Sequence, residues 1–91
     1  MDNQESVYVK LIEKYKDKQL IVAIEELSEL QKELCKSLRG NINKENIIEE
    51  LADVLIMLDQ LKIYFKIEDD EIRDIIDKKI ERTKERLLKE F

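Results

Sequence analysis

The sequence predicts an all-α protein that forms a single domain over residues 1–91. There is no proline and only one glycine, so the chain has few helix breakers. Apolar residues recur at spacings of three and four, which is the period of an amphipathic helix. Apolar and charged residues each make up 43% of the chain, as in helices with a core-facing side and a charged surface. We therefore expect a four-helix antiparallel bundle, completed by oligomerisation because so short a chain buries little surface on its own.

The first two helices are expected at residues 7–16 and 18–38. Asp17 is a candidate N-cap for the second helix, and Gly40 is a candidate left-handed terminator just after it. The second helix carries an apolar stripe that we expect to face inward, made of Leu20, Ile24, Leu27, Leu30, Leu34 and Leu38.

The third helix is expected to begin after Asn43, a good N-cap, and to run to about Lys66. One of its faces carries Leu51, Val54, Leu58, Leu61 and Phe65, and Ala52, Ile56 and Ile63 lie nearly opposite. One neighbouring helix covers only one side, so a second subunit is expected to cover the other, in a homo-oligomeric dimer or tetramer. A fourth helix is expected at residues 69–89, packing back on the hairpin of the second and third.

Acidic residues form a close set on each helix of this hairpin. The second helix carries Glu25, Glu26 and Glu29, which helical spacing places on one face, roughly opposite the leucine stripe. The third carries Glu50 and Asp53, and Asp53 lies inside the most apolar run of the chain. A carboxylate in apolar surroundings is costly unless it is hydrogen-bonded, paired with a cation or bound to a metal.

The hairpin brings these carboxylates to similar levels. In two antiparallel helices, residues that lie at the same level have residue numbers that add to the same total. The short link near Asn41 sets this total, to within about one helical turn. It places Glu29 beside Glu50 and Glu26 beside Asp53. Converging carboxylates repel one another without a cation. Mg²⁺, or alternatively Mn²⁺, suits oxygen ligands and leaves room for water and substrate phosphates.

The paired motif, E-E-L-S-E at 25–29 and E-L-A-D at 50–53, resembles the signature of the MazG-like all-α nucleoside triphosphate pyrophosphohydrolases. The resemblance covers about residues 20–87. It implies a Mg²⁺-dependent hydrolase of dimeric or tetrameric helical form that converts a nucleoside triphosphate to the monophosphate and pyrophosphate. The implied metal ligands are Glu26, Glu29, Glu50 and Asp53. Glu25 would orient or deprotonate the attacking water.

Positive charge for a triphosphate is available on the expected fourth helix. Lys79, Arg82 and Arg86 are spaced three and four apart beside an apolar stripe. Such cations often snorkel at the edge of an apolar stripe and have no further role. The resemblance, which includes basic residues on this helix, makes them phosphate-binding candidates, Arg86 the weakest of the three.

Two other functions fit parts of the pattern. The apolar spacing of the third helix is compatible with a non-enzymatic, coiled-coil-like interaction module. A metal-binding relative without catalytic activity would retain the carboxylates. A net charge of −5 argues against binding a nucleic acid polymer. No apolar run reaches membrane-spanning length, and a single cysteine, Cys35, fits a reducing compartment, so we expect a cytoplasmic protein that binds no membrane.

Overall fold

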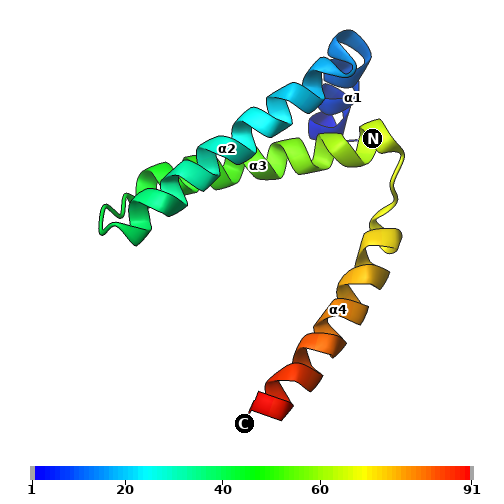
Figure 1. The fold of residues 1–91 in the computed structure, drawn as a ribbon. Coiled ribbons are helices and arrows are strands. Elements are labelled where there is room, and N and C mark those ends of the chain that lie inside the picture. Colours follow the sequence, from blue (N-terminus) through cyan, green and yellow to red (C-terminus); the bar gives the residue numbers. More distant parts are fainter. Residues whose placement is uncertain (1, 91) are drawn as a thin grey trace.

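The computed structural model describes residues 2–90, which are all-α with no strand, as the sequence predicts. The helices are α1 (Asn3–Tyr15), α2 (Lys18–Leu38), α3 (Lys44–Phe65) and α4 (Asp69–Glu90). Helices α2 and α3 form the expected antiparallel hairpin, and α1 packs near its open end, mainly on α3 (Figure 1). Helix α4 projects away from these three helices (Figure 1). Within residues 2–90, no helix is both long enough and apolar enough to cross a membrane.

The start of α1 differs from the prediction. The helix begins at Asn3, four residues before the expected start, because the Asp2 side chain accepts a hydrogen bond from the Glu5 backbone N–H at 2.6 Å. Asp17 is at the predicted N-cap position of α2, but its side chain makes no capping hydrogen bond. The chain turns between α1 and α2 at Lys16, whose φ is 52°.

The remaining helix ends follow local chemistry that the sequence shows. Gly40 has a φ of 90° after α2, so it ends this helix in a conformation that favours glycine. Asn43 caps α3 by accepting a hydrogen bond from the Asn46 N–H at 3.1 Å. Helix α4 starts with a capping interaction in which the Glu68 N–H donates to the Glu71 carboxylate at 2.8 Å.

The contact face between α2 and α3 is unexpectedly polar. Its buried residues are Gln19, Ala23 and Glu33 on α2 and Val54, Met57 and Gln60 on α3. The Gln19 side-chain amide donates a hydrogen bond to the side-chain Oε1 of Gln60 at 2.8 Å, and both side chains are buried. Gln19 and Gln60 have the same number total as Glu26 and Asp53, so this bond confirms the predicted register.

The inward orientation predicted for the leucine stripe of α2 is wrong for the single chain. Ile24 is 63% exposed and Leu38 is 89% exposed, because α2 turns its glutamine and glutamate side toward α3. Helix α3 likewise leaves part of its leucine stripe outside. Since the helices are antiparallel, both stripes turn the same way from the contact face and form one surface. This surface, called the apolar face below, consists of Ile24, Leu27, Leu34, Leu38, Ile48, Leu51, Leu55, Leu58 and Phe65.

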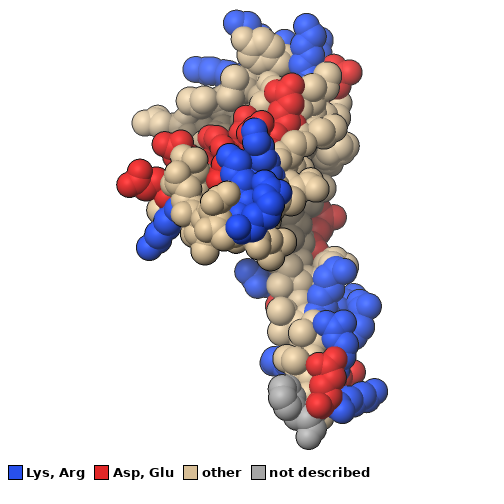
Figure 2. Space-filling view, turned by 60° about the vertical axis from the view of Figure 1, so that its left-hand side comes forward, with Lys and Arg blue, Asp and Glu red and all other residues tan. Residues whose placement is uncertain are grey.

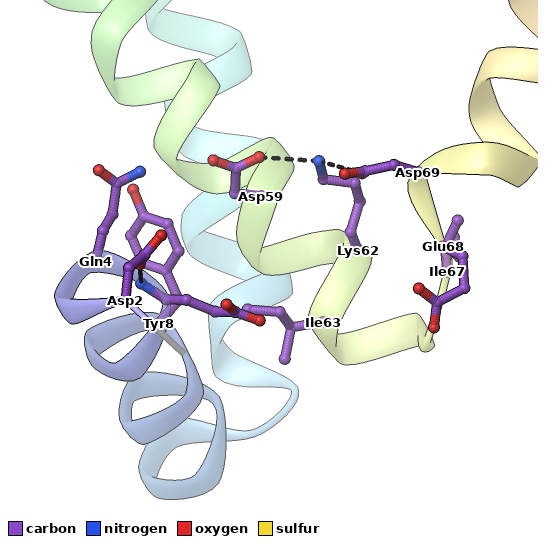
Figure 3. A pocket seen from close by; sticks show the side chains of 10 residues that line it. Asp2, Gln4, Tyr8, Asp59, Lys62, Ile63, Ile67, Glu68 and Asp69 are labelled. Atoms are coloured by element: carbon purple, nitrogen blue, oxygen red, sulfur yellow. Dashed lines mark hydrogen bonds and ion pairs between the residues drawn. The ribbon is translucent and has the colours of Figure 1, made fainter.

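The predicted packing of the fourth helix on its own hairpin is also wrong. No residue of α4 is buried, and its stripe of isoleucines is open to solvent. The short link at residues 66–68 directs α4 outward. Lys66 ends α3 in the left-handed conformation, and the Lys62 side chain bridges Asp59 at 3.1 Å and Asp69 at 2.8 Å (Figure 3). These ion pairs border a polar cavity of about 380 Å³ between α1, α3 and the start of α4.

The buried glutamine pair gives a stability prediction. Gln60→Leu alone should destabilise the fold by about 1–3 kcal/mol, because the Gln19 amide stays buried without its partner. The double variant Gln19→Leu/Gln60→Leu should recover most of that loss, since neither polar group remains. Urea unfolding at one fixed protein concentration measures both values. Additive losses in the double variant would contradict a direct coupling of the two amides.

Candidate metal centre

Three carboxylates converge across the α2–α3 contact. One oxygen each from Glu26, Glu50 and Asp53 lie within 4.8 Å of one another, a spacing that one cation can bridge. Glu26 comes from the middle of α2, and Glu50 and Asp53 come from successive turns of α3. Glu26 and Glu50 are half-buried, whereas Asp53 is exposed. The apolar surroundings expected for Asp53 are therefore absent in the single chain, where it lies at the edge of the contact face.

The three carboxylates lack compensating positive charge. Among residues 2–90, no ion pair joins any of them to a lysine or arginine. Burial raises the pKa of Glu26, and the negative charge of Asp53, a hydrogen bond with its carboxyl group, and the charges of Glu50 and Glu29 raise it further. Burial also raises the pKa of Glu50, and four acidic neighbours, Asp53 first among them, add to this effect. The cluster is under electrostatic strain that a cation would relieve.

Glu33 belongs to the same surroundings, although the sequence analysis did not single it out. It is only 7% exposed and lies on the α2 side that faces α3. Its Oε1 accepts from Lys36 at 3.3 Å, but its Oε2 is buried without a hydrogen-bond partner. The signal that could have found it is its spacing of seven from Glu26, which places both on one helix face.

The oxygen donors present fit a hard divalent cation. Oε2 of Glu50 is buried and has no hydrogen-bond partner, so this half-buried carboxylate has an unused acceptor beside Glu26 and Asp53. A buried carboxylate oxygen without a donor is costly, and a coordinated cation removes that cost. Carboxylate oxygens are the ligands that Mg²⁺ and Mn²⁺ prefer. Among the described groups of acidic residues, this is the one whose ligand atoms come close enough to hold an ion.

The other predicted acidic residues lie at the border of this group. Glu29 is outside the group of three, yet its negative charge acts on both Glu26 and Glu50. Glu25 is exposed and also lies outside the group. The structure therefore brings together three of the four predicted metal ligands, with the fourth nearby.

The predicted phosphate-binding residues lie elsewhere in the single chain. Lys79, Arg82 and Arg86 line one shallow depression on α4, together with Thr83. Helix α4, which carries these cations, projects away from the hairpin that carries the carboxylates (Figure 1). Figure 2 shows basic side chains along the projecting helix. None of the three takes part in an ion pair with another described residue.

A scan against protein-family models, a search of curated proteins and a search of solved structures find no match to this chain. The MazG-like resemblance accordingly rests on the paired motif and on its spacing.

The strained carboxylates predict a particular pH dependence. In metal-free buffer, lowering the pH from neutral toward the ordinary carboxyl pKa of 4.5 should favour folding more in the wild type than in Glu26→Gln/Glu50→Gln. A raised pKa means that these groups bind protons more tightly in the folded state. Stability from this source therefore increases as the pH falls through the raised pKa values toward the ordinary value of 4.5, and is lost as the pH rises. Urea unfolding across this range measures the difference, and identical slopes would contradict the proposed strain.

Proposed function

We propose that this chain is a Mg²⁺-dependent hydrolase that converts (deoxy)nucleoside triphosphates to monophosphates and pyrophosphate, with Mn²⁺ as an alternative ion. The observation that carries the proposal is the convergence of Glu26, Glu50 and Asp53 without a cation among the described residues. A purely structural cluster would be expected to have a lysine or arginine partner. The MazG-like motif connects such a cluster to this reaction.

In this proposal, Glu26, Glu29, Glu50 and Asp53 hold the metal. When bound, Mg²⁺ polarises the phosphoryl oxygens and lowers the pKa of coordinated water. In the proposal, Glu29 moves toward the group of three and becomes the fourth ligand. Its negative charge already contributes to the raised pKa of Glu26. Glu25, exposed on the same helix, accepts the proton of the attacking water.

Water is the nucleophile because the side chains near the carboxylates offer no alternative. Ser28 donates its hydroxyl proton to the Ile24 carbonyl oxygen at 2.9 Å, so its hydroxyl is engaged within α2. The sequence contains no histidine to activate it or Cys35. The motif resemblance favours attack at the α-phosphorus, which leaves pyrophosphate as the departing group.

The proposed active form is a cytoplasmic homo-oligomer, a dimer or a tetramer. The exposed residues of the apolar face form one group on neighbouring helices and are not isolated surface leucines. A contiguous exposed apolar surface of this kind marks an interaction site. The same observation favours a second candidate function, a helical interaction module without catalysis. A catalytically inactive relative that still binds metal is a third. Substrate turnover separates the first candidate from the other two.

The activity test is a screen of nucleoside triphosphates with Mg²⁺ in heavy-oxygen water. We expect pyrophosphate to be released and the label to appear in the monophosphate, because water attacks the α-phosphorus. Mass spectrometry of both products reads out the position of cleavage. Label in inorganic phosphate, together with a nucleoside diphosphate product, would contradict the proposed cleavage site. Absence of turnover with every substrate would contradict the proposal that this chain is an enzyme.

Charge-removing variants test the ligand assignment. Glu50→Gln and Asp53→Asn should each lower kcat by about 10²-fold or more while the protein stays folded, because each keeps the side-chain shape and loses a metal-binding charge. Glu49→Gln is the matched control, since Glu49 is an adjacent exposed acid outside the group of three. Equal activity of Glu50→Gln and Glu49→Gln would remove Glu50 from the site.

A further inference from the structure

The single chain separates two charged surfaces of opposite sign. Glu26, Glu50 and Asp53 of the α2–α3 hairpin form no ion pair with a cation among residues 2–90, and Lys79, Arg82 and Arg86 on α4 form none with a carboxylate. Two other cations of α4 are paired within the helix, Lys84 with Glu81 at 3.2 Å and Arg73 with Asp77 at 3.9 Å. Lys79, Arg82 and Arg86 lie beside the apolar stripe of α4, and Lys78 and Lys89 are likewise in no ion pair with another described residue.

That stripe identifies the side of α4 that needs a partner. Ile72, Ile76 and Ile80 are between 36% and 50% exposed, and no α4 residue is buried. Helical spacing places Lys79, Arg82 and Arg86 along one edge of this stripe. An occupant of α4 must therefore offer an apolar surface bordered by negative charge.

The hairpin offers such a surface on its acidic side. Ile56 is 40% exposed there, and it lies one helical turn from Asp53. Glu25 and Glu29 border the same side on α2, where they are exposed. The acidic side thus combines one exposed isoleucine with a row of carboxylates, and these carboxylates complement the cationic edge of the α4 stripe.

Helix α4 is directed away from its own hairpin. The link between α3 and α4 is three residues long, and its geometry is held at both ends. The Ile67 N–H donates to the Lys62 carbonyl oxygen at 2.9 Å, while the Lys62 ammonium group binds Asp69 at 2.8 Å (Figure 3). These bonds favour an α4 that leaves its own chain and reaches another.

We propose that two copies of this chain exchange their α4 helices, so that α4 of each copy lies on the acidic side of the other copy's hairpin. Lys79 and Arg82 then face the carboxylate cluster of the partner and bind the phosphates of a substrate held there. A 22-residue helix is about 33 Å long and about 10 Å wide, so two exchanged helices bury on the order of 1,300 Å² in total, within the range of stable interfaces. The catalytic site is incomplete in one copy and complete in two.

Zero-length carbodiimide crosslinking tests the exchange without any assay of activity. A reagent that joins a lysine amine directly to a contacting carboxylate is applied to a mixture of isotopically heavy and light chains that were unfolded and refolded together. We expect links from Lys79 to hairpin carboxylates, with about half of them joining a heavy chain to a light one, because subunits combine at random in a symmetric dimer. Lys84, on another side of α4 and paired with Glu81, is the control and should not link to the hairpin.

Links found only within single chains, or a monomer in light scattering at micromolar concentration, would overturn the exchange. Links from α4 to the apolar face instead of the acidic side would also overturn it. This readout stands whether or not the proposed hydrolase activity is correct.

A mixed-subunit assay adds the catalytic part, and this part rests on the proposed function. Glu50→Gln and Lys79→Ala/Arg82→Ala are co-expressed with different tags, and the mixed oligomer is purified through both. Each parent should be inactive. The mixed oligomer should regain about half of the wild-type activity, because one exchanged site then pairs an intact hairpin with an intact α4. No recovery, alongside an active wild type and a correctly formed mixed oligomer, would show that the two charged surfaces do not form a shared site.

Discussion

Repulsion among the carboxylates of Glu26, Glu50 and Asp53 is the constraint on which the rest of this structure depends. These groups lie in the contact between α2 and α3, within 4.8 Å of one another, and burial adds to the cost of their charge. If the hairpin needed only stability, leucines would be expected in this contact in place of carboxylates, since α2 and α3 both carry a leucine stripe. The retained cost supports the proposed cation site.

The polar contact face also determines what remains outside. Because Gln19, Glu26 and Glu33 occupy the side of α2 toward α3, the leucine stripe turns away and stays exposed. Helix α4 is uncovered for a separate reason, the outward link that Lys62 and Asp69 hold in place. The single chain therefore has two uncovered surfaces, the apolar face and the α4 stripe, and the proposed homo-oligomer would cover both.

The sequence predicted α2, α3, α4 and the register of the hairpin well because these depend on local chemistry, whereas the cap at Asp2 that starts α1 was missed. Asn43 and Gly40 act as expected, and the short link determines which residues of the hairpin meet. The prediction failed where the choice depended on tertiary contacts. Periodicity shows that α2 has an apolar stripe and a polar side, but not that the polar side is the one that packs, and no local signal in residues 66–68 shows that α4 turns outward. Glu33 was missed for the same reason, since one glutamate among 22 acidic residues is distinguished only by its burial.

The measurement that tests the central claim most directly is thermal unfolding with and without Mg²⁺. At a free concentration a hundredfold above Kd, a bound ion stabilises the folded state by about 2.7 kcal/mol, a rise in Tm of roughly 10–20 °C for a domain of this size. We predict this rise for the wild type and for the control Glu49→Gln, and its loss in Glu50→Gln. A wild-type Tm that is unchanged by Mg²⁺ and by Mn²⁺, or an equal rise of Tm in Glu50→Gln, would contradict the proposed metal centre.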